Sequence, residues 1–380
     1  MAISGVLLTV LAGATVPVPV RPDVAARVRS VTVTEGEKDR SVFSVVLDAG
    51  RSGPLAMLDA PVLSDSTFAL GHRVVLLLTV GALPQVLMDG IVTRTDFAPG
   101  NGADEPSTLT VTGEDVSFLL DLEEKDVEHP ALSDYLQVLR ILAPYASRGL
   151  VPLAVPPLAF ELPLPTEKVP GQHDTDLRHL QALARRNSYV CYVVPGPVPG
   201  TSTFYWGPPV RVGLPQPALS VALGAQTNVR GTPRFTADAV APVTVTGAVR
   251  DPSSGSTVPV AARTSLRPPL AAVPLTAVAT PRTRVLRETG TTTTSAAARA
   301  QGAVDAAADA SVVGEGELDG AVYGSVLRPR GLVGLRGAGW TYDGLWYVRK
   351  VVHEIAPGSW TQKFTVAREG YGSTVPAVPV

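Results

Sequence analysis

Residues 71–77 read Gly-His-Arg-Val-Val-Leu-Leu, and they are followed by Asp-Gly-Ile-Val-Thr-Arg at 89–94 and by a third β-rich run at 107–113. The same order returns near the end of the chain, with Arg-Gly-Leu-Val-Gly-Leu-Arg at 330–336, Asp-Gly-Leu-Trp-Tyr-Val-Arg at 343–349 and a third run at 360–368. Each copy is a glycine-led strand, an Asp-Gly turn, a strand, a turn and a further strand. Because an internal repeat determines architecture before any single motif does, we predict two similar β-domains.

The turns of this repeated unit are predicted from its glycines and Asp-Gly pairs. Asp and Gly tolerate the positive φ of tight hairpin turns, and the flanking alternation places one strand face on a core. The predicted turn residues are Gly71, Asp89 and Gly90 in the first copy, and Gly331, Asp343 and Gly344 in the second. Each copy is also preceded by a Thr-Val strand, at 31–34 and at 243–246. Chance recurrence of Asp-Gly hairpins in a β-protein is the alternative explanation.

Working outward, the predicted fold class is mainly β, with an α+β insertion between two similar antiparallel β-barrel domains. Apolar residues at helical spacing predict a helix over 133–145 capped by Ser133, and a second helix capped by Asp174. The predicted segments are an N-terminal strand or extension at 1–24, a first barrel at 25–115, the insertion at 116–235, a second barrel at 236–369 and a C-terminal tail at 370–380. Within the second barrel, residues 258–312 are expected to form a long exposed excursion followed by an alanine-rich helix that needs a partner to be stable.

Composition narrows the classes of function. Charged residues make up 17% of the 380 residues and the net charge is −2, so no overall basic field favours nucleic acid as a partner. The single cysteine, Cys191, lies in an apolar run, which excludes a disulfide within the chain and favours a buried thiol. The apolar stretch at 6–12 lacks the basic front of a signal peptide and is interpreted as a strand, and no run is long enough to insert in a membrane. We therefore expect a protein of cytoplasmic origin.

Two polar clusters contain the residue types that catalytic or metal sites use. The residues His173, Asp174, Asp176 and His179 are interpreted as helix capping and surface solvation, because the first two precede the helix. The acidic run at 123–126 is interpreted as a solvated connection. The sequence contains no nucleophile elbow, phosphate loop or HExxH motif. We therefore expect no catalytic residues, no metal and no cofactor.

Four aromatic residues gather in the last hairpin of the second copy: Trp340, Tyr342, Trp346 and Tyr347. Strand alternation places part of this set in a core or a subunit interface. A platform that binds carbohydrate is the alternative interpretation of the same residues.

The order of elements resembles the late-control D-type hub of contractile phage tails, and the hub half of valine-glycine repeat proteins in type VI secretion. The segments that carry the resemblance are 113–121, 171–180, 296–320, 347–353 and 359–364, together with the two repeated units. They cover most of the chain from about residue 25 to residue 370.

This resemblance implies a homotrimer in which two barrels per subunit form a pseudo-sixfold ring. Such a hub joins a threefold spike to a sixfold inner tube within the baseplate of a phage-tail-like particle. The expected partners are an inner tube protein, other baseplate proteins and a separate spike protein, since the further barrel and β-helical needle of spike-bearing members do not follow the hub region here. The alternative function is a carbohydrate-binding β-protein of a cell surface or a tail.

Overall fold

Alternating apolar residues form the strands of the first barrel unit, because every second side chain of a strand faces the same side. In β4 (Val28–Gly36) and β5 (Val42–Asp48), Val31, Val33 and Val45 are fully buried while their neighbours in sequence are partly exposed. The computed structural model describes residues 2–3, 5–50, 62–63, 65–100, 106–157, 162, 166, 169–250, 255–287 and 292–375.

The first barrel unit is a curled sheet of six antiparallel strands in the order β2-β6-β7-β8-β5-β4. Its other strands are β2 (Val6–Gly13), β6 (Arg73–Val80), β7 (Leu83–Ala98) and β8 (Thr108–Asp115). Short elements on β2 and beside the core are β1 (Ala2–Ile3), β3 (Val18–Pro19), helix α1 (Pro22–Ala25) and a 3₁₀ turn (Ser66–Phe68). Val24 and Phe68 from these turns join the apolar core.

The second barrel unit repeats this topology, with the strand order β14-β21-β22-β23-β20-β15. Its strands are β14 (Gln216–Ser220), β15 (Val229–Ala237), β20 (Val312–Asp319), β21 (Leu332–Arg336), β22 (Gly344–Ala356) and β23 (Ser359–Arg368). If the six strands of each unit are numbered in chain order, both sheets have the same strand order. The one difference in direction is that β14 runs parallel to β21, whereas β2 runs antiparallel to β6. The prediction of two similar β-domains is confirmed.

The Asp-Gly turn predicted in the first copy is wrong. Asp89 and Gly90 lie in the middle of β7, and Gly81 with Ala82 makes the turn between β6 and β7. Asp89 is buried and forms an ion pair with Arg73, with 2.6 Å between Oδ1 and Nε. Gly90 is needed for close packing, because a Cβ there would lie 2.4 Å from the Glu114 carbonyl oxygen.

The remaining turn residues lie at the ends of strands. Gly71 has a φ of +81° and precedes β6, and Gly331 immediately precedes β21. Asp343 and Gly344 stand where the β21–β22 connection ends, and Gly344 has a φ of +120°. The Thr-Val strand at 243–246 is not the counterpart of the one in β4, because it belongs to a separate sheet. The counterpart of β4 is β15.

The insertion unit follows β8 and contains two helices and two small sheets. Helix α2 (Asp134–Leu142) is capped by Ser133 as predicted, whereas α3 (Asp176–Arg186) is capped by Thr175 and not by Asp174. Asp174 lies in β11 (Gly171–Thr175), which pairs with β9 (Glu124–Glu128). The second sheet has β13 (Ser202–Gly207) between β10 (Leu150–Ala154) and β12 (Val190–Pro195), and 3₁₀ turns occupy Val116–Asp121 and Ala143–Arg148.

A helix–sheet unit is inserted between β15 and β20. Its sheet consists of β16 (Val243–Arg250), β17 (Thr257–Ala262) and β19 (Arg282–Val285), so the expected irregular excursion is instead partly a sheet. Helix α4 (Thr293–Asp309) packs Ala296, Ala300 and Val304 on that sheet, which is the partner that its composition required. Within the excursion, 288–291 lie outside the described residues. The smaller elements are 3₁₀ turns at Gly224–Gln226 and Leu275–Ala277, strand β18 (Ala271–Pro274) and helix α5 (Gly320–Tyr323).

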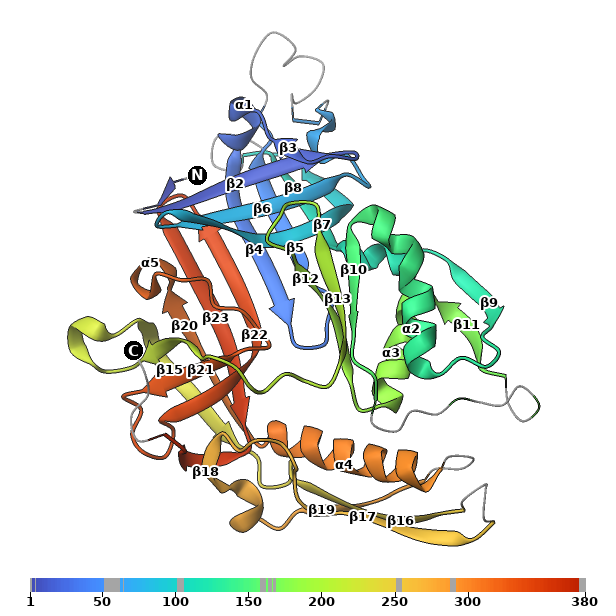
Figure 1. The fold of residues 1–380 in the computed structure, drawn as a ribbon. Helices are drawn as coiled ribbons and strands as arrows, with labels where there is room; N and C mark the ends of the chain where they lie inside the picture. The colour runs from blue at the N-terminus through green and yellow to red at the C-terminus, as the bar shows by residue number, and fades with distance from the viewer. Residues whose placement is uncertain are drawn as a thin grey trace.

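The expected segment boundaries do not coincide with the sheets. Strand β2, expected as an N-terminal strand or extension outside the first barrel, is a strand that pairs with β6 along its whole length. Strand β14 and most of β15, expected in the insertion, belong to the second barrel unit. The start of the predicted tail forms β24 (Gly370–Ser373), which pairs with β18, while 376–380 lie outside the described residues. Figure 1 shows the first barrel unit above the second, the insertion unit on the right, and α4 near the bottom above strands β16, β17 and β19. None of the helices in the described part of the chain is long and apolar enough to cross a membrane.

Candidate assembly interface

The two barrel units are joined edge to edge by β4 and β22, and we call this junction the seam (Figure 1). The first half of β22 pairs with β21, from Gly344 to Tyr347. Beyond a bulge the second half leaves β21 and pairs antiparallel with β4, from Lys350 opposite Gly36 to Ile355 opposite Val31. One long strand therefore belongs to both sheets, which form a single continuous hydrogen-bonded surface.

Apolar packing crosses the seam. Ile355, Trp360 and Val326 come from the second barrel unit, yet they are buried in the core of the first unit. The junction is stabilised by backbone hydrogen bonds and by buried apolar area, which is the main favourable term in association. The two units therefore behave as one folded body.

A buried polar group lies inside the seam. Glu35, at the end of β4, is 2% exposed, and Arg328 Nη1 lies 3.4 Å from its carboxylate. His353 on β22 is fully buried, with its Nε2 3.5 Å from the same carboxylate. Burial opposes ionisation of Glu35, but the charge of Arg328 and the contact with His353 outweigh it and lower the pKa of the carboxyl group. Burial lowers the pKa of His353, so its imidazole is neutral near pH 7.

Arginines of the second unit also hold the backbone of the first. Arg328 donates to the carbonyl oxygens of Val86 and Leu87 in β7. Arg330 donates to the carbonyl oxygen of Gly36, with 2.5 Å between the atoms, and its guanidinium stacks 3.9 Å from the ring centre of Tyr192 in the insertion unit. These charge-assisted contacts fix the register of the two units as well as their distance.

The repeated topology gives each of the two strand edges that form the seam a counterpart in the other unit. In the described structure, no strand pairs with either of these counterpart edges. Pairing of β7 with β6 ends at Ile91, so the stretch from Arg94 to Ala98 is bonded to β8 on one side alone. This stretch is the counterpart of the part of β22 that binds β4. Strand β15, the counterpart of β4, is bonded to β20 alone. Both edges are largely exposed.

Matching bulges align these edges residue by residue. Where β7 pairs with β8, it bulges between Val92 and Arg94. Where β22 pairs with β23, it bulges between Val348 and Lys350. This alignment makes Phe97 the counterpart of the fully buried His353, yet Phe97 is 43% exposed. Val33 faces His353 across the seam. The register can be followed from β4 through β5 to β8 in the first unit, and from β15 through β20 to β23 in the second. It makes Phe235 the counterpart of Val33.

The polar cluster predicted at the start of α3 is a hydrogen-bonded joint within the insertion unit. Asp176 is buried and accepts from Tyr145, Gln172 and Lys125 at 2.6–2.7 Å. His173 is the exposed residue of β11 and lies beside Asp126, and His179 contacts Gln137 and stacks on His129. In the described residues, no three His, Cys, Asp or Glu side chains are placed to hold a metal ion.

Three other sequence predictions are placed by the structure. The acidic run at 123–126 is not a simple connection, because it enters strand β9. Cys191 is buried as predicted, and burial raises the pKa of its thiol to about 12. Of the four aromatics, Trp346 and Tyr347 are buried, Tyr342 stacks on Phe235 at 4.6 Å, and Trp340 is exposed.

Sequence reasoning missed the ion pair between Glu35 and Arg328 in the seam. Glu35 and Arg328 lie far apart in the chain, and neither belongs to a recognisable motif. The available signal was an acidic residue at the end of an apolar alternating strand, since a buried carboxylate requires a partner.

Solved structures share this fold across nearly the whole chain. The chain is similar to a tail protein from Neisseria meningitidis MC58, with 11% identity and a TM-score of 0.64 over 96% of this chain and 97% of that one. It is also similar to the 43 kDa tail protein of prophage MuSo2 from Shewanella oneidensis, with 14% identity and a TM-score of 0.63 over 95% and 98% of the two chains.

A type VI secretion component has the same fold. This Escherichia coli protein, described as structurally similar to T4 bacteriophage tail proteins gp27 and gp5, matches with 11% identity and a TM-score of 0.54 over 93% of this chain and 76% of that one. No protein-family model matches the chain, and no curated protein matches its sequence. The resemblance to tail proteins is therefore confirmed at the level of the fold.

Proposed function

We propose that this chain is the structural hub of the baseplate of a phage tail or contractile injection system. It assembles as a homotrimer whose six barrel units form a pseudo-sixfold ring, and it joins a trimeric spike to the sixfold inner tube. The observation that carries this proposal is the duplicated six-strand topology, in which one seam is filled and its counterpart edges are open.

The open edges account for ring closure. Edge strands present unpaired backbone groups and favour pairing with another chain. When β15 of one copy pairs with the second half of β7 of the next, the contact repeats the geometry of the seam. This interface is heterologous, because it joins two different edges, and such interfaces form rings when the rotation between copies closes. Three copies would then alternate internal seams with contacts between subunits around six units.

Symmetry matching follows from this arrangement. Six units with one topology present six similar surfaces to a sixfold tube, while the sequence differences between the units leave threefold surfaces for a spike. The insertion unit and the helix–sheet unit, which differ from each other, are available to other baseplate proteins. The role is transmission of force and not catalysis.

The titratable residues support a structural role. Asp176 and Asp89 are each held by several donors inside the fold, and Glu35 is held by Arg328 and His353. Carbohydrate binding is less well supported, because Trp346 and Tyr347 are buried and only Trp340 of the aromatic set is mainly exposed.

Oligomeric state and partner binding test the proposal. Native mass spectrometry should find a trimer, alone or in the presence of the spike protein, and the trimer should bind both spike and tube proteins. A monomer that ignores both partners would contradict the proposed function. A peptidoglycan-release assay should detect no activity, and clear release would favour a hydrolase instead.

A further inference from the structure

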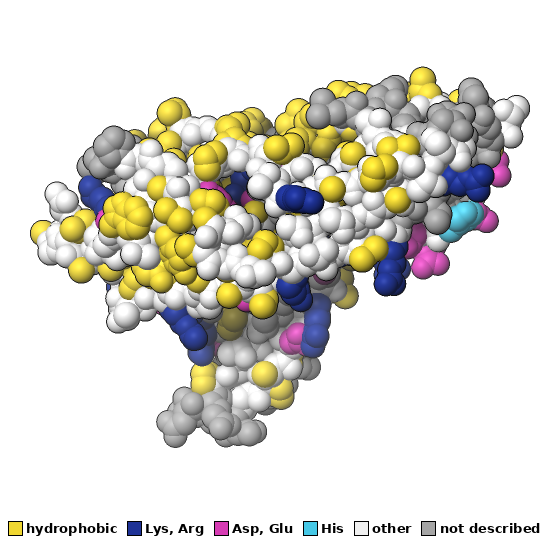
Figure 2. Space-filling model, turned by 90° about the horizontal axis from the view of Figure 1, so that it is seen from below, with side chains coloured by type: hydrophobic (Ala, Val, Ile, Leu, Met, Phe, Trp, Pro, Cys, Tyr) yellow, Lys and Arg dark blue, Asp and Glu magenta, His cyan; other side chains and the backbone are white. Residues whose placement is uncertain are grey.

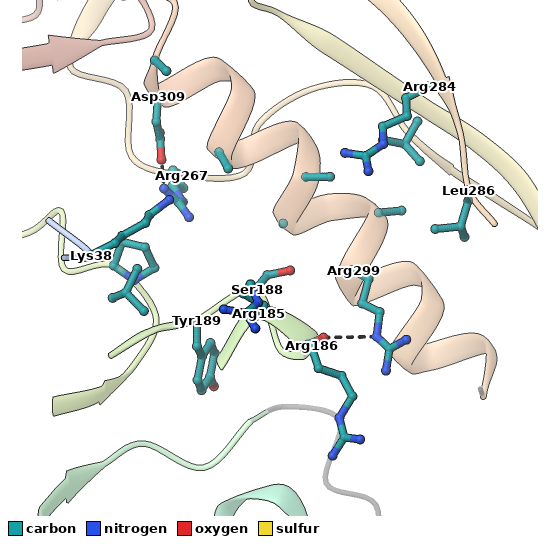
Figure 3. Close-up of a pocket in the computed structure, with 18 of the residues that line it drawn as sticks. Lys38, Arg185, Arg186, Ser188, Tyr189, Arg267, Arg284, Leu286, Arg299 and Asp309 are labelled. Atoms are coloured by element: carbon teal, nitrogen blue, oxygen red, sulfur yellow. Dashed lines mark hydrogen bonds and ion pairs between the residues drawn. The ribbon is translucent and has the colours of Figure 1, made fainter. Parts of the chain in front are cut away.

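A cationic cleft lies where all four units of the chain meet, and it plays no part in the proposed ring contact. Its volume is about 1130 Å³. Figure 3 shows its side chains gathered around α4, with Arg299 reaching the end of α3 and Asp309 beside Arg267. The cationic residues that line it are Lys38, Arg185, Arg186, Arg211, Arg267, Arg284, Arg287, Arg299 and Arg349, and the carboxylates are Glu37 and Asp309.

Ion pairs within the protein neutralise only part of this charge. Arg211 and Arg267 share Asp309, Arg267 Nε also lies 3.9 Å from Asp305, and Arg349 pairs with Glu37 at 3.1 Å. Arg186 pairs with Asp134, which lies outside the cleft. Of the five other cations, Arg299 is held at the end of α3, and across the described ranges no carboxylate pairs with Lys38, Arg185, Arg284 or Arg287.

Like charges are also held close together. Burial, and then the neighbouring charge of Arg299, lowers the pKa of Arg186. Burial, and then the charge of Arg211, lowers the pKa of Arg267. Arg211 is 4% exposed, and its Nε has no hydrogen-bond partner among the described residues. Such crowding costs folding free energy that a bound anion would offset.

Structural roles explain some of these residues but not all. Arg185 and Arg186 lie in the last turn of α3, where cations favour the helix dipole, and Arg299 Nε donates to the carbonyl oxygen of Arg186 at 3.1 Å. Lys38 comes from the β4–β5 turn and Arg284 from β19, and neither contacts a helix end or a carboxylate in the described structure. Their convergence on one cleft therefore requires another explanation.

We propose that this cleft binds an acidic segment of a partner polypeptide. Its volume exceeds the roughly 300–1,000 Å³ of ordinary small-molecule sites. Its cations come from four separate parts of the chain, which suits carboxylates spaced along a peptide better than a single phosphate. Arginine forks pair with carboxylates in two-point contacts.

Nucleic acid fits the surface less well. The chain has a net charge of −2, and phosphate-backbone binding requires a continuous basic track. Figure 2 shows mainly apolar and uncharged side chains on the face seen from below, with Lys and Arg scattered across it. The Lys and Arg side chains on that face lie apart and do not form a continuous track.

Binding of a fluorescein-labelled hexaglutamate peptide, followed by fluorescence anisotropy, tests the proposal. The double variant Arg284→Ala, Arg287→Ala should weaken binding by about tenfold, because it removes two cations that pair with no carboxylate among the described residues. Arg282→Ala is the matched control, since Arg282 lies on β19, is exposed and does not line the cleft. Thermal unfolding should show that the variants remain folded, as both residues are exposed.

Carbodiimide cross-linking locates the peptide. Lys38 should form an amide with the hexaglutamate, identified by mass spectrometry, and Lys38→Arg should abolish that cross-link while it preserves binding. Absence of binding, or equal binding by the double variant and the control, would overturn the proposal. Tighter binding of a single-stranded oligonucleotide at the same residues, or full displacement by inorganic phosphate, would also overturn it. Ring formation is measured separately, so this test does not depend on the trimer.

Discussion

Phe97 provides the most direct test of ring closure through β7. It is 43% exposed, although its counterpart in the second unit, His353, is fully buried at the seam. An aromatic side chain buries roughly 200 Å², so covering the exposed part of Phe97 removes about 90 Å² from water. At about 25 cal/mol per Å², this contributes about 2 kcal/mol to each contact between subunits.

Phe97→Ala should therefore weaken each contact by about 30-fold. Sedimentation equilibrium measures the effect as a shift from trimer toward monomer at a fixed protein concentration. Leu83→Ala is the control, because Leu83 is 72% exposed at the opposite end of β7 and lies outside the counterpart of the seam. An unchanged trimer in Phe97→Ala, or an equal shift in both variants, would refute the edge pairing.

Paired cysteines test the register of the same contact. The seam pairs Glu354 with Thr32, so its counterpart places Ala98 of one copy opposite Arg234 of the next. Ala98→Cys with Arg234→Cys should form covalent trimers on oxidation. The pair Ala98→Cys with Thr236→Cys, displaced by two residues, should not. A trimer without the first cross-link would reject the register while it leaves the proposed hub intact.

Three further outcomes follow from the fold. Gly90→Ala should lower the free energy of unfolding by about 2 kcal/mol in a urea titration, because its Cβ would lie 2.4 Å from the Glu114 carbonyl oxygen; an unchanged midpoint would restore the turn interpretation. Unfolded His353 takes up a proton near pH 6.5 whereas the buried side chain resists it, so the Tm should fall as the pH drops from about 7 to 5, and less so in His353→Gln; parallel pH profiles would contradict this. Because the pKa of Cys191 is raised to about 12, its thiol should react with a disulfide reagent at neutral pH only after denaturation, and rapid reaction of the native protein would count against burial.

Sequence patterns predicted the local elements that depend on neighbouring residues. Alternation in β4 and β5, the Ser133 cap of α2 and the alanine-rich α4 all depend on side chains a few residues apart. The repeated meander was also visible, because both copies keep their strands in the same order.

Contacts between residues far apart in the chain could not be predicted from the sequence. Asp89 and Gly90 have the composition of a turn, but the pairing of β7 with its neighbours placed them inside a strand. Strand β15 keeps little of the alternation seen in β4, because most of its residues are exposed. The ion pair of Glu35 with Arg328 depends on the association of two sheets, which no local pattern records.

The shared strand β22 makes the two joints of the proposed ring mechanically unequal. Every internal joint is braced by one polypeptide that runs through both sheets and by side chains buried across it. A joint between subunits has no such brace. A load that opens the ring would therefore part it at three places and release intact double-barrel subunits, so the weakest links lie at every second position around the circumference.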